Sequence, residues 1–369
     1  MWDENHCYHY FSVSPGDISF SAIVKGSMIF LNIIGLIGTL LVVYGLIKQA
    51  QRKDGLIYTD YGVVFRGFLA LIALADSIVI LMSIFMQDLE FYSELFRSEN
   101  MYTGWLSLVK IVYPVAHITE SYSTMMLLST ALGVCHVVIR SFKGAGCNGE
   151  RLNKKKLVFT GLAVTIFVFA ILLQIPSFLI LKIFENKGCE HETAFERYTL
   201  QATHFMTRYS YKIYDIIVSV IFFTVLIPLA TGIVGIVLCV FLKRRAASGG
   251  KVRPLTSSGK SMFDYGTVKS SNGDKQSVNT KQGTQMETSI LEDNLLQAFS
   301  IVVLIVFFVK IPGIVLRIME QMAISLLLNH QTLYTVFDTV QNLANHLLHG
   351  YKWVVYFVKA PELYETLRK

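Results

Sequence analysis

The sequence predicts an all-α membrane protein, in which seven transmembrane helices form one bundle with the N-terminus outside the cell and the C-terminus inside. Three observations lead to this prediction: a very apolar composition, several uncharged stretches long enough to cross a bilayer, and an uneven distribution of basic loops. Of the 369 residues, 53% are hydrophobic, more than a soluble domain of this size can bury. We expect the excess to face lipid, which makes the bilayer the first partner of the chain.

The apolar stretches set the number of spans. A bilayer core about 30 Å thick takes roughly 20 apolar residues of helix, and residues 157–181 and 216–242 contain no charge at all. The seven expected spans cover residues 22–47, 65–87, 105–139, 157–182, 211–242, 294–319 and 333–358. The transmembrane domain is then 22–358, with an extracellular N-terminus (1–21), a disordered cytoplasmic third loop (243–293) and a short cytoplasmic amphipathic tail (359–369).

Lysine and arginine set the orientation, because basic loops are retained in the cytoplasm. The loops after the first, third and fifth expected spans are basic, and nine Lys or Arg residues lie between Lys243 and Lys281 alone. The loops after the second and sixth spans are acidic or nearly uncharged. The formal charge of +7 is therefore mostly cytoplasmic, where it faces anionic lipid, so no nucleic-acid partner is needed to explain it.

Ionisable residues inside the expected spans are the main functional signal, because a charge in the bilayer is costly. Asp76, Glu120, Lys310 and Lys352 lie in the second, third, sixth and seventh spans. The seventh span also carries a polar stripe at helical spacing, formed by Asp338, Asn342, Asn345, His349, Lys352 and Tyr356. Such a stripe must line the interior of a bundle or a watery cavity. The plain alternative is that each of these residues only satisfies another one inside the bundle.

Several segments resemble helix motifs of rhodopsin-like (class A) G-protein-coupled receptors, in the right order. LALAD with Asp76 is similar to the second-helix motif and GLIGTLLVVYGLI to the first, while Pro176, Pro228 and Pro312 stand where helices four, five and six carry prolines. The end of the seventh span, followed by VKAPELYETLRK, resembles a seventh helix that runs into a short amphipathic helix. Within the class, LLQIPSFLILKIFE and IPGIVLRIME are most similar to invertebrate FMRFamide-type neuropeptide receptors and nematode serpentine chemoreceptors.

The resemblance implies a multi-pass plasma-membrane receptor for an extracellular neuropeptide or small chemosensory ligand, with a heterotrimeric G protein and arrestin as cytoplasmic partners. It also implies a ligand site in the outward-facing cavity between spans three, five, six and seven. The ligand-binding candidates there are His117, Ser121, Tyr214, Arg317 and Asp338. By the same resemblance, Cys135, His136 and Tyr356 are the candidates that face the G protein.

The sequence departs from the receptor pattern at several positions. The arginine of the inner third-helix motif is absent, with Cys135 at its place, and Lys310 and Lys352 replace a tryptophan and an asparagine. The resemblance places Asp76 beside the position of Lys352, so we expect these two to pair and Glu120 to pair with Lys310, as an internal polar switch. The third span also lacks its outer cysteine, which leaves Cys189 to pair with Cys7 or to stay free.

Two other functions stay open. The missing arginine favours a non-signalling seven-helix decoy or trafficking partner, and the row of ionisable residues is compatible with an ion- or proton-coupled transporter. An enzyme is not expected, because the sequence contains no Walker loop, no His-Glu-x-x-His and no Cys-x-x-Cys motif. The His and Cys residues also lack metal spacing, so we expect no catalytic residue, no metal and no cofactor.

Overall fold

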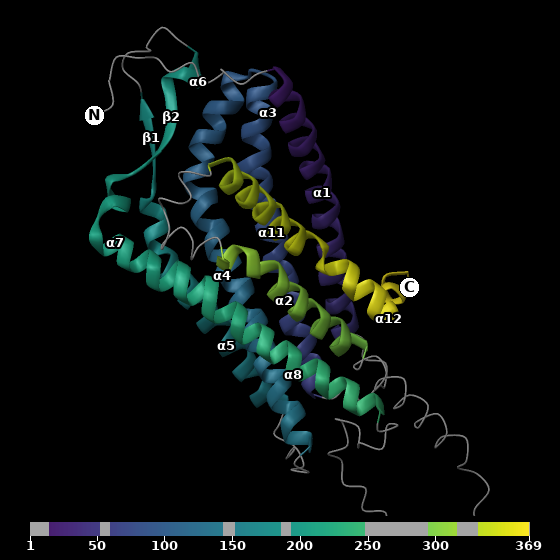
Figure 1. Cartoon of the computed structure of the whole chain (residues 1–369). Coiled ribbons are helices and arrows are strands. Elements are labelled where there is room, and N and C mark those ends of the chain that lie inside the picture. Colours follow the sequence, from purple (N-terminus) through teal and green to yellow (C-terminus); the bar gives the residue numbers. More distant parts are fainter. Residues whose placement is uncertain are drawn as a thin grey trace, which may run out of the picture.

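The computed structural model describes residues 15–51, 60–142, 152–185, 193–247, 294–315 and 331–368, and the statements below concern these residues. Long helices run side by side along most of the molecule, and a small sheet lies at one end (Figure 1). The long helices are α1 (Pro15–Gln51), α2 (Asp60–Ser83), α4 (Glu99–Phe142), α5 (Leu152–Gln174), α8 (Ile227–Ala247), the helix Asn294–Val315 and α11 (Gln331–Lys359).

Shorter elements continue or join the long helices. A π-helical turn, η1 (Ile84–Asp88), and α3 (Leu89–Leu95) extend α2, and the short helix α12 (Pro361–Arg368) follows α11. α7 (Tyr209–Tyr214) and the π-helical η5 (Asp215–Leu226) lead directly into α8, so that one helix runs from Tyr209 to Ala247. The remaining elements are η2 (Ile175–Leu179), β1 (Leu181–Glu185), α6 (Ala194–Arg197), β2 (Tyr198–Ala202) and η4 (His204–Thr207).

Five of the described helical segments are long and apolar enough to cross a membrane: Ser27–Gln51, Gly62–Met86, Leu157–Leu179, Tyr209–Arg244 and Asn294–Val315. The chain is therefore a helical, multi-pass membrane protein. α4 and α11 fall outside this set although each has the length, because polar side chains recur along both helices. The apolar helices carry hydrophobic side chains on the surface of the bundle. Those of Val158, Phe167 and Ile233 are exposed there.

Two local features were not expected from the sequence. β1 and β2 form a short antiparallel pair, from Leu181 opposite Ala202 to Glu185 opposite Tyr198, in a fold that is otherwise helical, as expected. In the fourth expected span, 157–182, α5 stops at Gln174 and η2 continues the helix to Leu179. The cause is Pro176, which has no N–H to continue the α-helical hydrogen bonds.

The centre of the bundle is a close-packed apolar core that contains Met126, Leu238 and Phe299, all fully buried. Phe299 meets the ring of Phe65 edge to face at 5.4 Å. A separate cluster at the sheet end holds the hairpin on α4, where the Tyr102 hydroxyl donates to the Tyr198 carbonyl at 3.0 Å. The hairpin is thus fixed to the helix bundle by contacts of its own.

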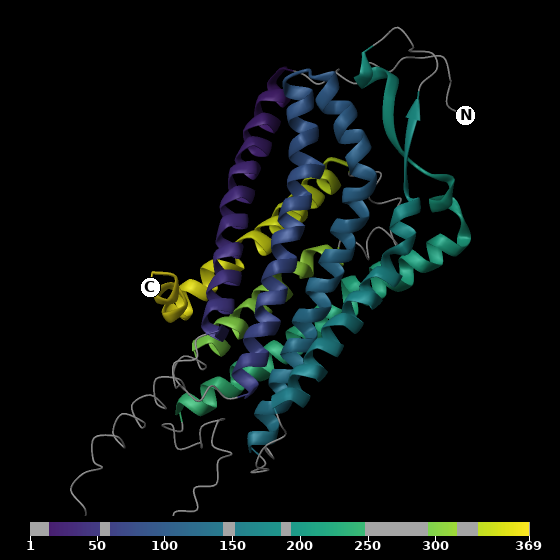
Figure 2. The ribbon, with the colours of Figure 1, turned by 180° about the vertical axis from the view of Figure 1, so that it is seen from behind.

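Two glycines bring α11 against α1, a contact that decides what α11 faces. Seen from behind, α11 crosses the row formed by α1, α2 and α4 (Figure 2). A Cβ atom at Gly35 would lie only 2.8 Å from Gly350 Cα, and one at Gly38 would overlap the indole ring of Trp353. Because only glycine permits this approach, α11 sits close enough to direct its polar side chains at α2.

Candidate functional site

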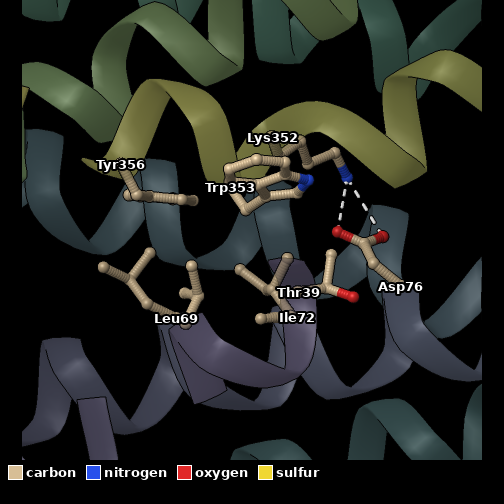
Figure 3. Close-up of a pocket in the computed structure, with 9 residues that line it drawn as sticks. Thr39, Leu69, Ile72, Asp76, Lys352, Trp353 and Tyr356 are labelled. Atoms are coloured by element: carbon tan, nitrogen blue, oxygen red, sulfur yellow. Dashed lines mark hydrogen bonds and ion pairs between the residues drawn. The ribbon is translucent and has the colours of Figure 1, made fainter. Parts of the chain in front are cut away.

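Asp76 is the centre of the candidate site, in the middle of α2. Lys352 of α11 donates from Nζ to both of its carboxylate oxygens, at 2.8 Å to Oδ2 and 3.1 Å to Oδ1 (Figure 3). The two side chains are 2% and 7% exposed, so the ion pair is sealed inside the bundle. The pairing expected from the sequence is therefore confirmed.

Two further donors complete the environment of Asp76. Ser123 of α4 donates its hydroxyl to Asp76 Oδ1 at 2.8 Å, and Nδ1 of His349 lies 2.7 Å from the same oxygen. An ionised carboxylate only accepts hydrogen bonds, so this imidazole nitrogen carries the proton. A buried ion pair persists only if its remaining lone pairs are also bonded, and here three side chains from two helices bond them.

The bonds of Ser123 and His349 to Asp76 were not predicted from the sequence. His349 stood in the polar stripe of the seventh span, one helical turn before Lys352, and that spacing could have placed both on Asp76. Ser123 follows Glu120 by one turn on α4, which is the only signal that marked it. A serine in a long helix carries little information by itself, because its hydroxyl can bond to its own backbone.

A small pocket lies beside the ion pair and is mostly apolar. Thr39, Leu69, Ile72, Trp353 and Tyr356 line it together with Asp76 and Lys352 (Figure 3). The Thr39 hydroxyl donates to the Gly35 carbonyl at 2.9 Å and accepts from the Ser77 hydroxyl at 3.0 Å. These hydroxyls bond to each other and not to Asp76, so the carboxylate depends on α4 and α11 for its partners.

A second ion pair joins α4 to the Asn294–Val315 helix, also as expected. Lys310 Nζ donates to Glu120 Oε1 at 3.0 Å. This pair differs from the first in its accessibility, because the Glu120 side chain is 36% exposed and that of Lys310 is 18% exposed. Of these two ion pairs, the first is sealed and the second is accessible.

The structure gives structural roles to two of the five ligand-binding candidates. The Ser121 hydroxyl accepts from Gln174 of α5 at 2.9 Å and is buried. Tyr214 donates its hydroxyl to the carbonyl of Leu173. Both side chains thus tie α5 to neighbouring helices, and their contact with a ligand stays a prediction.

The other three candidates have different outcomes. His117 is half-buried on α4, one turn N-terminal to Glu120, where its ring meets that of Tyr113 edge to face at 4.5 Å. It remains a ligand-binding candidate. Arg317 lies outside the described residues, and Asp338 belongs to α11 but its side chain lies outside the description.

The three candidates for contact with a G protein also differ in how exposed their side chains are. His136 is exposed near the C-terminal end of α4, and Cys135 beside it is half-buried with a free thiol. Tyr356 does not face outward: it is buried, lines the pocket beside Asp76 and so faces the bundle interior. This corrects its expected position. The proposed pair of Cys7 and Cys189 lies outside the described residues.

Within the described ranges, no three His, Cys, Asp or Glu side chains come together as metal ligands would. Comparison with known proteins does not assign the chain to a family. No model of a protein family matches the chain, and a search of curated proteins finds no significant relative.

Proposed function

We propose that the chain is a plasma-membrane receptor with the architecture of rhodopsin-like G-protein-coupled receptors, which binds an extracellular neuropeptide or small chemosensory ligand. The observation that supports it best is the position of Asp76, whose bonds join α2, α4 and α11 deep in the bundle. A polar network that ties several helices together inside a membrane couples their positions. A ligand that moves one of these helices therefore moves the others with it.

The proposed spans are the five apolar helices together with α4 and α11. Each polar helix directs a charged group at a partner inside the bundle, Glu120 at Lys310 and Lys352 at Asp76. Helices that satisfy their polar groups inside a bundle need less hydropathy than helices that face lipid all round. This supports seven spans, and the basic loops support an N-terminus outside and a C-terminus inside.

The short helix α12 supports the same architecture. The chain turns at Ala360, and α12 then packs on α1, where Leu363 is fully buried against Gly45. Gln49 of α1 donates to the Thr366 hydroxyl at 3.3 Å. A short amphipathic helix held at the end of the last span fits a position along the inner membrane surface.

Cys135 and Lys310 stand where the receptor pattern has an arginine and a tryptophan. These replacements affect one part of the proposal above all, which is signalling through a heterotrimeric G protein and arrestin. A decoy or trafficking partner would keep the helix bundle and would bind the ligand, but it would not couple to a G protein or arrestin. A transporter would move an ion through the network instead. In the sealed site Lys352 and two other donors already occupy Asp76, which favours a fixed internal joint over an ion path.

The experiment that separates these functions uses the full chain in cultured cells. A reporter with chimeric G proteins, an arrestin-recruitment assay and ion-flux recordings are run against one library of peptides and small molecules. The receptor proposal expects a saturable response that Asp76→Asn weakens, while Arg197→Gln, which breaks an exposed ion pair on the hairpin, leaves it unchanged. Saturable binding without a G-protein or arrestin response would establish the decoy. A ligand-driven current would establish the transporter.

A further inference from the structure

We propose that the Glu120 and Lys310 side chains form the floor of the ligand site, and that the ligand is a small zwitterion with one cationic group, one anionic group and no net charge. The proposal rests on the receptor function above and selects the small-ligand form of it. The ligand ammonium would take the place of Lys310 at Glu120, and the ligand carboxylate would take the place of Glu120 at Lys310.

Accessibility distinguishes this pair from the one around Asp76. The Glu120 carboxylate is 36% exposed and accepts a bond from Lys310, whereas Asp76 is 2% exposed and bonded by three side chains. The pair joins two helices of the bundle, and the exposed part of the Glu120 side chain leaves it accessible to a small molecule. A ligand can therefore reach this pair without opening the sealed network.

Charge balance argues for the ligand class. Glu120 and Lys310 neutralise each other as a pair. A ligand with a single charge would pair with one of these side chains and leave the other without a partner in a partly buried site, which is unfavourable. A zwitterion offers each side of the pair its opposite.

The residues N-terminal to Glu120 on α4 suggest the rest of the ligand. Tyr113 and His117 precede Glu120 by seven and three positions on α4, so they lie on the same face of the helix. Their rings pack edge to face with centroids 4.5 Å apart. An apolar or aromatic side chain on the zwitterion would meet these rings, so an aromatic amino acid is the natural first probe.

The test uses full-length protein purified in lipid nanodiscs, so that binding is measured without a G protein. Phenylalanine is compared with phenethylamine, which lacks the carboxylate, and 3-phenylpropanoate, which lacks the ammonium. The other protein amino acids follow, each with its amine and acid counterpart. We expect thermal stabilisation by at least one zwitterion and not by its two counterparts. Equal stabilisation by an amine or an acid, or none by any zwitterion, overturns the proposal.

Two single variants should each change the preference of the site from the zwitterion to a ligand with one charge. Lys310→Gln leaves Glu120 to favour the amine, and Glu120→Gln leaves Lys310 to favour the acid, each by roughly 10- to 100-fold in apparent Kd, the value of a charged hydrogen bond. Arg197→Gln is the matched control, because it breaks an exposed pair on the hairpin and should keep the zwitterion preference. Unchanged preference in both single variants contradicts the proposal.

A labelling experiment keeps the test valid if these variants do not fold. An amine-reactive reagent applied to wild-type protein should modify Lys310 and spare the sealed Lys352, as read by mass spectrometry. The bound zwitterion should protect Lys310, and modification that continues at saturating ligand overturns the site. These binding assays need no signalling. If the zwitterion binds but the cell reporter does not respond, only the proposed coupling to a G protein is contradicted. A reporter response to peptides with no zwitterion binding contradicts this inference only.

Discussion

Lys352 Nζ lies 2.8 Å from Asp76 Oδ2 and 3.1 Å from Oδ1, and Trp353, the next residue on α11, covers Gly38 of α1. The ion pair and the helix contact are thus neighbours in sequence and in space. α11 reaches Asp76 only because glycines let it approach α1, and the approach in turn seals the charges from water. The buried pair and the close packing therefore depend on each other, and each can be tested separately.

The ion pair should behave as a unit. Asp76→Asn or Lys352→Met alone leaves a buried charge without its partner, which is expected to cost about 3–5 kcal/mol. The double variant leaves no buried charge from this pair and should recover much of the loss. Cell-surface expression and thermal unfolding of all three variants measure this coupling. Strictly additive losses would show that the two residues do not act together.

The Ser123 bond to Asp76 should be worth more than an ordinary serine hydroxyl in a helix. Ser123→Ala removes a bond to a charged acceptor, so we expect a loss of about 1.5–3 kcal/mol in stability. Thr119→Val is the control on the same helix, because the Thr119 hydroxyl bonds only to the Val115 carbonyl of its own helix. A similar melting temperature for the two variants would contradict a role of Ser123 in the network.

The contact between α1 and α11 should tolerate no side chain at Gly35 or Gly38. Gly35→Val would place atoms against the Gly350 backbone, and Gly38→Leu would collide with Trp353, with losses of about 1–3 kcal/mol or more expected from overpacking. Gly133→Ala and Gly161→Ala provide controls, because an added Cβ there meets nothing within 4 Å. Comparable surface expression of both sets would show that α1 and α11 are not held this closely.

Ser121 and Gln174 should matter for stability but not for ligand recognition. Ser121→Ala leaves the Gln174 amide without its acceptor inside the α4 and α5 contact, so the melting temperature should fall, by a free energy of about 1–3 kcal/mol. His117→Ala, one turn N-terminal to Glu120, should instead weaken the response with little change in melting temperature. Dose-response curves beside unfolding curves separate the two effects. A large loss of potency in Ser121→Ala would return this residue to the ligand site.

The sequence by itself determined the apolar helices, because hydropathy is a property of a segment and needs no partner. It also predicted both ion pairs. Four charges inside spans must find partners, and the resemblance to receptor helices placed Asp76 beside Lys352, which left Glu120 for Lys310. Tyr214 and Tyr356 could not be placed in this way, because each is compatible with a lipid, ligand or packing role until the rotation of its helix is known.

Only the tertiary structure decided which hydroxyls enter the network. Ser107 and Thr119 bond to their own helix while Ser123 bonds to Asp76, yet all three are small hydroxyl residues on one helix. The difference arises from the face that α4 presents to α2 and from the close approach of α11 to α1 through Gly35 and Gly38. Helix rotation and separation are set by packing between distant segments, so no local pattern encodes them.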